Sequence, residues 1–207
     1  MPAGGRALKT CEYDGDPFPS AGARSHPWTD AVASEAFRYY DLRASPAHIR
    51  TSLEDFVPWS RYAAIEGFYT LLEWLNGDAS PFESNDCAFT APHANESASV
   101  AQPLTCSGRV MLLFRDLPLN VSTGDVTWLK DALHLALGPL DDTLELGVVG
   151  TTLVPVRYLG LPADAQLGQE LMVSFWAWGG TEAEVMANLA RVMVSLSSAL
   201  RSVSLEV

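Results

Sequence analysis

Residues 82 to 89, FESNDCAF, place two carboxylates, a serine, an asparagine and a cysteine in a row between two phenylalanines. A cysteine nucleophile needs a base within hydrogen-bond reach and a third group that orients the base. Cys87, His93 and Asp86 supply these residue types within one short stretch. With Cys106 as a further thiolate, the same set contains the donors of a metal site. The sequence therefore offers one candidate for cysteine or metal chemistry.

The local sequence favours a different interpretation. Asp86 and Cys87 are adjacent, so a strand that starts at Cys87 directs their side chains to opposite faces. Asn, Asp and Ser also gather in turns, because their side chains bond their own backbone. We predict a polar turn at the entry to a strand, with Glu83 and Asp86 as contacts for a basic partner. The catalytic set of Cys87, His93 and Asp86 is the alternative.

A second set of polar residues follows the helix predicted at residues 59 to 77. Tyr62, Glu66, Tyr69 and Glu73 are spaced by four, three and four residues, so they share one helix face. Glu66 and Glu73 are two turns apart, about 10 Å along the axis. That separation is too long for the two carboxylates alone to ligate one ion, and it is at the outer limit for an inverting glycosidase pair. A half-exposed face is the favoured interpretation, and a pocket lined by both glutamates is the alternative.

The alternation in residues 171 to 178, LMVSFWAW, predicts a strand with two different faces. One face receives Leu171, Val173, Phe175 and Ala177, and the other receives Met172, Ser174, Trp176 and Trp178. If helices cover the first face, both tryptophans lie on the second. They are then either covered by the N-terminal helices or available as anchors for a partner, since Trp is enriched in interface hot spots.

Several function classes are disfavoured by what the chain lacks. It has no GxGxxG, P-loop, GxSxG or HExxH motif, and Cys11, Cys87 and Cys106 show no CxxC spacing. We therefore expect free thiols, no structural metal and no cofactor. The formal charge of −12 disfavours nucleic acid and anionic membranes. No apolar run reaches the ~20 residues of a membrane span, and the N-terminus has no apolar signal core, so we expect a cytoplasmic protein.

The first half of the chain divides by composition. Residues 1 to 27 mix Gly, Pro, Ser and Asp without hydrophobic periodicity and predict a flexible arm. Residues 28 to 77 predict a helical N-terminal subdomain. Residues 78 to 108, rich in Ala, Ser, Pro and Asn, predict a long loop with at most one short strand near Cys87 to Thr90. Helices are expected at residues 26 to 42, 45 to 56 and 59 to 77.

The second half predicts a sheet covered by helices. Apolar runs indicate strands at 109 to 117, 143 to 150, 152 to 160 and 170 to 178. Pro155 cannot donate to a central ladder, so its strand must be an edge or carry a bulge. We predict the α+β class for residues 109 to 207, with a mostly antiparallel sheet of about four strands and two helices on one face. We expect residues 28 to 207 to form one compact unit.

The two helices of this half are marked by their capping residues. Ser122 and Asp125 open a helix at 122 to 137, on which His134 falls on the solvent side. Thr181 and Glu184 form a capping box for the last helix. Its apolar positions repeat at intervals of four and three, which predicts packing on the sheet: Val185, Leu189, Val192, Leu196, Ala199 and Val203.

The charge and the missing motifs together favour a binding protein. We expect an acidic cytoplasmic protein that neutralises or assists a specific basic protein partner, for example an immunity protein that neutralises a toxin. The proposed contacts are Glu83, Asp86, Trp176 and Trp178. One alternative is a small enzyme, or an accessory subunit of one, that uses Cys87 and His93 or a Glu66 and Glu73 pocket. Another is a structural subunit of a larger assembly, and self-association of the chain is left open.

Overall fold

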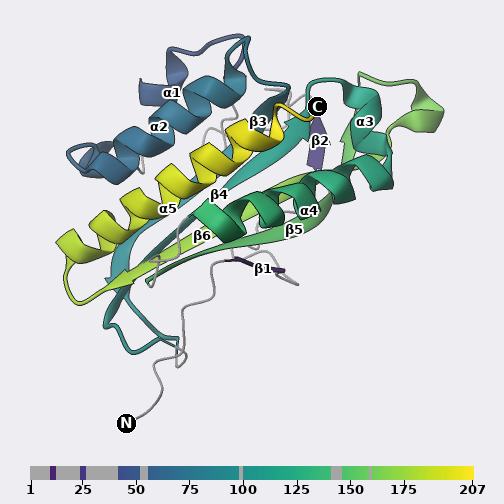
Figure 1. The fold of residues 1–207 in the computed structure, drawn as a ribbon. Coiled ribbons are helices and arrows are strands. Elements are labelled where there is room, and N and C mark those ends of the chain that lie inside the picture. Colours follow the sequence, from purple (N-terminus) through teal and green to yellow (C-terminus); the bar gives the residue numbers. More distant parts are fainter. Residues whose placement is uncertain are drawn as a thin grey trace.

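The computed structural model describes residues 10–12, 24–26, 42–51, 56–97, 100–140, 146–158 and 160–207. Its centre is an antiparallel sheet in the order β5-β6-β4-β3 (Figure 1). Two short strands pair in parallel with the outer edge of β5. The strands are β1 Thr10–Glu12, β2 Arg24–His26, β3 Phe82–Ala94, β4 Leu104–Phe114, β5 Gly147–Tyr158 and β6 Leu167–Gly179.

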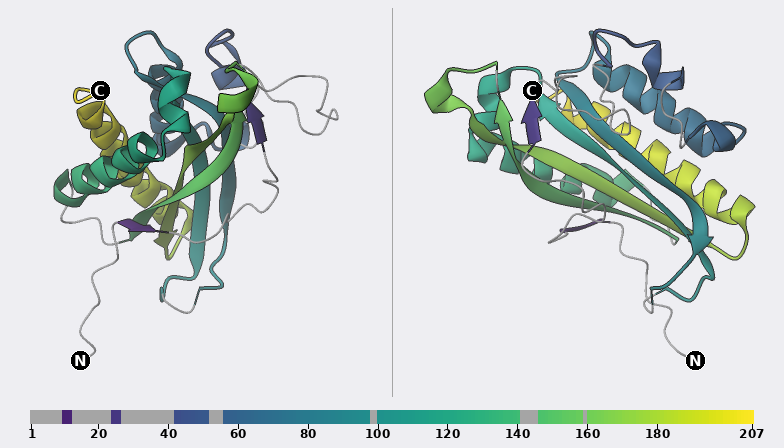
Figure 2. Two further views of the ribbon diagram at one scale, coloured as in Figure 1. Left: turned by 90° about the vertical axis from the view of Figure 1, so that its right-hand side faces the viewer. Right: turned by 180° about the vertical axis from the view of Figure 1, so that it is seen from behind.

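Three long helices cover one face of this sheet, which confirms the predicted α+β class. They are α2 Ala63–Asn76, α4 Thr123–Leu140 and α5 Glu182–Val203. Figures 1 and 2 show α5 between α2 and α4, so the helix expected in an N-terminal subdomain joins the same layer as the other two. The shorter elements are α1 His48–Thr51, η1 Val57–Trp59, α3 Leu117–Val121 and η2 Ala163–Ala165.

The central helix α5 forms as its sequence predicts. The Thr181 hydroxyl accepts from the Glu184 amide at 3.3 Å, and the Glu184 carboxylate accepts from the Thr181 amide at 3.2 Å. These reciprocal bonds satisfy donors that a helix start leaves open. All six residues of the predicted apolar stripe are buried in the main core. The stripe packs on the sheet, as expected.

The predicted long loop at 78 to 108 is wrong over most of its length. β3 runs through the stretch FESNDCAF and pairs with β4, with register shifts between Ser84 and Asp86 and between Thr90 and His93. The polar side chains form hydrogen bonds with other elements instead of stabilising a turn. For example, the Asn76 amide of α2 donates to the Ser84 hydroxyl at 2.8 Å. Polarity at this point marks cross-element hydrogen bonds, not a turn.

β5 replaces two predicted strands. Residues 147 to 158 form one continuous strand where the sequence suggested a break after residue 150, while residues 141–145 and 159 lie outside the described part. β1 pairs with residues 149–151 and β2 with residues 156–158. Pro155 falls between these two pairings, so its missing N–H interrupts neither of them. Its strand lies beside only short partners on that side, in line with the predicted edge position.

Other expectations for the N-terminal part fall on residues that are only partly described. The arm predicted at 1 to 27 contains β1 and β2, and its remaining residues lie outside the described ranges. Residues 27–41 of the helix predicted at 26 to 42 also lie outside them. The helix predicted at 45 to 56 is described at its first part, where α1 forms, and residues 52–55 are not described.

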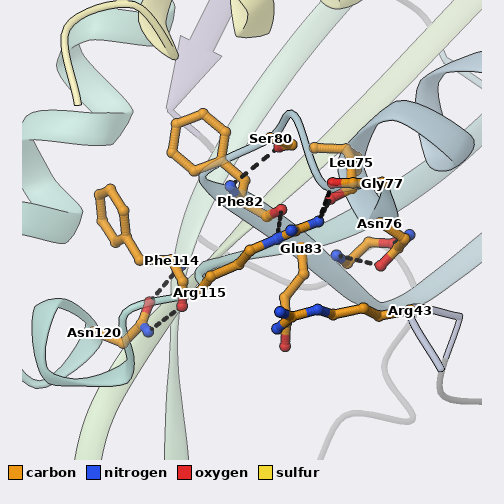
Figure 3. Close-up of polar contacts among 11 residues, drawn as sticks. Arg43, Leu75, Asn76, Gly77, Ser80, Phe82, Glu83, Phe114, Arg115 and Asn120 are labelled. Atoms are coloured by element: carbon orange, nitrogen blue, oxygen red, sulfur yellow. Dashed lines mark hydrogen bonds and ion pairs between the residues drawn. The ribbon is translucent and has the colours of Figure 1, made fainter.

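A half-buried arginine joins the end of α2 to the sheet. Figure 3 shows the Arg115 guanidinium at the point where β4 ends, donating to the carbonyls of Leu75, Gly77 and Phe82. Beside it, the Asn120 side chain bonds both the N–H and the C=O of Phe114, each at 2.8 Å. Carbonyls at a helix C-terminus have no partner within the helix. Arg115 therefore ties the end of α2 and the start of β3 to the end of β4.

Replacing Arg115 by Ala should lower the free energy of unfolding by about 2–3 kcal/mol, because partly buried carbonyls then lose a charged donor. Urea unfolding followed by circular dichroism measures the change. Arg157→Ala is the matched control, since Arg157 lies on β5, is exposed and donates to the Gln166 side chain instead of to backbone carbonyls. An equal loss in both variants would show that Arg115 acts only as a surface charge.

Candidate functional site: the second face of the sheet

The sheet face opposite the three long helices collects several of the residues singled out in the sequence, among them Asp86, His93, Trp176 and Trp178. On β6, Leu171, Val173, Phe175 and Ala177 lie in the core under the helices, which places their neighbours on the other side. We call this other side the second face. Its residues include Asp86, Thr90 and His93 of β3, Thr105, Ser107, Arg109 and Met111 of β4, and Glu170, Met172, Ser174, Trp176 and Trp178 of β6.

Strand alternation separates the proposed cysteine site. Cys87 is opposite Val110 and packs against the core beneath the helices, whereas Asp86 is opposite Met111 on the second face. His93 is six residues further along β3, about 20 Å at the rise of a strand, and its Nδ1 lies 2.8 Å from the Ala91 carbonyl oxygen. The structure brings neither Asp86 nor His93 to Cys87. His93 is therefore too far from Cys87 to act as the base of a thiolate mechanism.

Metal chemistry finds no support from the described side chains either. Among them, no group of three or more His, Cys, Asp or Glu residues lies close enough to hold an ion. Cys106, the proposed additional thiolate, is fully buried in the core, and burial raises its pKa to about 12. A thiol with that pKa stays protonated near neutral pH and is a poor ligand or nucleophile.

The second face instead holds two buried polar pairs. The Arg109 guanidinium donates to the Asp86 carboxylate at 3.1 Å, and their side chains are only 5% and 12% exposed. The Asn85 amide donates to the Glu170 carboxylate at 2.8 Å, with Glu170 fully buried. The register shift between Ser84 and Asp86 is a β-bulge that directs both Asn85 and Asp86 to this face. The first pair links β3 to β4, and the second links β3 to β6.

Glu83 is engaged within the chain as well. Its carboxylate lies 3.3 Å from the Arg43 guanidinium, and its side chain is 13% exposed. The sequence-based placement of Glu83 and Asp86 on an exposed loop is therefore wrong, because both lie on β3, are mostly buried and form ion pairs with arginines. Their carboxylates hold the strand in place instead of facing solvent.

No protein-family model, curated protein or solved structure matches this chain. None of the helices in the described ranges is both long enough and apolar enough to cross a membrane.

On the second face, Tyr158 adds one more buried polar group, with its hydroxyl donating to the Gln169 carbonyl at 2.8 Å. Burial, and then the nearby charges of Glu170 and Glu83, raise the pKa of Tyr158. The hydroxyl is therefore a neutral hydrogen-bond donor at any physiological pH.

Trp176 and Trp178 lie on the second face as the alternation predicts. Trp176 is opposite Ser107 and Trp178 is opposite Thr105, at the end of the sheet where β3 connects to β4. Both indoles are partly exposed, unlike Met172 and Ser174 further along the same strand. Their role as anchors for a partner stays a prediction.

The glutamates of α2 serve a different purpose from the proposed pocket. Arg50 of α1 reaches both, with Nη1 and Nη2 each donating at 2.8 Å to Glu66 and Nε donating at 2.6 Å to Glu73. The guanidinium also lies over the Tyr69 ring, 5.2 Å from its centroid. The bonds to Arg50 lower the pKa of Glu66. A single arginine thus spans the two turns and clamps α1 to α2.

Sequence reasoning missed the partners of these groups. Arg50, Arg109 and Glu170 carry no local signal, because each meets its partner only after distant segments pack. His134 was expected on the solvent side, yet its Nε2 lies 2.6 Å from the Thr151 hydroxyl of β5 and the ring is half-buried. The only sequence signal for this contact is that His134 lies next to the buried apolar positions of its helix.

Cys87 and Cys106 should differ sharply in reactivity. At pH 8 a thiol with a pKa of about 12 is ionised in about one molecule in 10⁴, so Cys106 should resist iodoacetamide in the folded protein. Cys87 is half-buried and should be labelled faster. Peptide mass spectrometry after timed alkylation measures both, and unfolding in urea should equalise them. Rapid labelling of Cys106 before unfolding would contradict its buried position.

Asp86 and Arg109 should behave as a structural pair. Either Asp86→Leu or Arg109→Met alone should cost about 3–5 kcal/mol, because each leaves one buried charge without its partner, while the double variant should recover most of that loss. A double-mutant cycle from urea unfolding gives the coupling. If both single variants instead keep full stability, the pair does not hold the sheet, and Asp86 is again a candidate contact for a partner.

Proposed function

We propose that this chain is an acidic cytoplasmic binding protein that neutralises or assists a basic protein partner. The most concrete form is an immunity protein that inactivates a toxin by binding it. The main support is the charge at one end of the sheet, where exposed carboxylates gather. The formal charge of −12 over the chain agrees with this surface.

Four exposed carboxylates define what we call the acidic end. β3 begins, β4 ends, β5 ends and β6 begins at this end of the sheet, and the C-terminus lies there too (Figure 1). The connections carry Asp78 before β3, Asp116 after β4 and Asp164 between β5 and β6, and Glu206 follows α5. All four side chains are exposed.

Two of the arginines described near the acidic end are engaged within the chain, and Arg201 in the last turn of α5 stays exposed. Arg43 is bonded to Glu83, and the Arg115 guanidinium donates to backbone carbonyls at the end of α2 and the start of β3. Arg157 remains exposed and bonds the Gln166 side chain. Exposed charges of one sign steer an oppositely charged protein into encounter and discriminate against acidic competitors. A basic partner fits this end better than any polyanion.

Trp176 and Trp178 supply the second part of the proposal. They lie at the end of the sheet opposite the acidic end. Partly exposed tryptophans contribute affinity through desolvation, whereas exposed charges mainly raise the association rate. A partner that contacts both ends would lie along the sheet, with its basic surface at the connections and an apolar patch on the indoles.

The proposal is tested by using the full chain as bait in cells of its own source, at about 50 mM and about 500 mM salt. A protein with a basic surface should be recovered preferentially at the lower salt, because screening weakens exposed charge pairs. The association rate of the purified partner should then fall about 3- to 10-fold for Asp116→Asn/Asp164→Asn. For a toxin, equimolar chain should abolish its activity.

The matched control is Asp131→Asn, which removes one charge from an exposed position midway along α4, away from both ends of the sheet, and is compared with Asp116→Asn alone. It should change the association rate less than the acidic-end variant. Recovery of no protein at either salt, or of an acidic partner, would contradict the proposal. A stoichiometric partner whose activity does not change would favour the structural-subunit alternative.

A further inference from the structure

The outer face of α4 and α5 exposes apolar side chains that the fold does not use. Trp128 and Leu135 of α4 are 37% and 78% exposed, and Val194 of α5 is 67% exposed. Trp128 and Leu135 are seven residues apart, so they share one stripe of α4. The two helices are neighbours in the layer. We call these three residues the helix patch.

Two small side chains lie near this patch on α5. Ala187, seven residues before Val194, is exposed on the same side of the helix, and Ala190, four residues before it, is partly exposed and also packs against the core. Side chains this small allow a facing helix to approach closely, and ridges formed by Leu135 and Val194 can then enter its grooves. The surface has the shape and chemistry of one half of a helix–helix contact.

The charges on these helices indicate what occupies the patch. α4 and α5 carry the acids Asp125, Asp131, Glu182 and Glu184 and the bases Lys130, Arg191 and Arg201. This near balance contrasts with 25 acids against 13 bases in the whole chain. A strongly basic partner gains little here and is drawn to the acidic end instead. Two copies of an acidic chain repel each other least where their surfaces are close to neutral.

We propose that the helix patch is a self-association surface, at which a second copy of this chain packs its own α4 and α5. A two-fold contact buries the same surface on both copies, so it needs an apolar centre and charges of both signs around it. The patch offers Leu135 and Val194 as the centre, with Asp131 and Arg191 exposed on the same two helices. Asp131 stays 66% exposed beside Lys130.

Sedimentation velocity of the full chain between about 1 and 500 µM tests this, a range suited to a small interface. The chain should shift from monomer to dimer as concentration rises. Leu135→Glu and Val194→Glu should each weaken the dimer at least about tenfold, because they bury a like charge in a two-fold contact. Leu167→Glu is the control, since Leu167 is 79% exposed but lies at the start of β6.

Salt separates this association from partner binding. Raising salt from about 50 to 500 mM should tighten the dimer, because it screens the repulsion between two acidic chains. A monomer at every concentration and salt overturns the proposal, as does a dimer that Leu135→Glu and Val194→Glu leave unchanged. Both substituted side chains are largely solvated, so circular dichroism should report an intact fold for each variant.

Discussion

The packing of α5 against β6 and β4 is the contact on which the rest of the molecule depends. One apolar stripe on α5 buries the central strands, and its two flanks receive α2 and α4. Gly67 lets α2 approach closely, because a Cβ there would lie 3.3 Å from the Met193 Cβ. With α5 in place, the three helices occupy a single layer over one face of the sheet.

Because the helices cover one face of the sheet, the residues of β3 are divided between a helix-covered face and the second face. Phe82, Ser84, Cys87 and Phe89 turn toward the helices, and a bulge directs Asn85 and Asp86 together to the other side. The carboxylates there are paired and largely buried, so the exposed acids of the described residues lie elsewhere, in part on the connections at one end of the sheet. Position in the pleat, not residue type, decides which acids are available to a partner.

The parts of the fold with strong local signals were predictable. The capping box and stripe of α5, the apolar helix α2 and the alternation that places Trp176 and Trp178 opposite the helices all follow from local periodicity. β3 was missed because its period of two is broken by a bulge, and polar residues occupy its buried positions. β5 appeared as two strands because Gly150 and Pro155 resemble a break, although neither interrupts its ladder with β6.

The candidate site was less predictable for a related reason. Arg50 and Arg109 meet their carboxylates across 16 to 23 residues of chain, and Asn85 meets Glu170 across 85. No window of sequence contains such a pair, so Glu83 and Asp86 looked like free surface charges. Tertiary contacts alone reveal that these residues stabilise the sheet.

The two short strands beside β5 have a consequence for solubility. A long unpaired strand edge is a template on which another chain can add strands and begin an aggregate. Along β5, β1 and β2 each occupy three residues, and Pro155 lies between them without an N–H to donate. An incoming strand therefore cannot continue a regular ladder along this edge, and cross-β growth of the kind found in amyloid is blocked there.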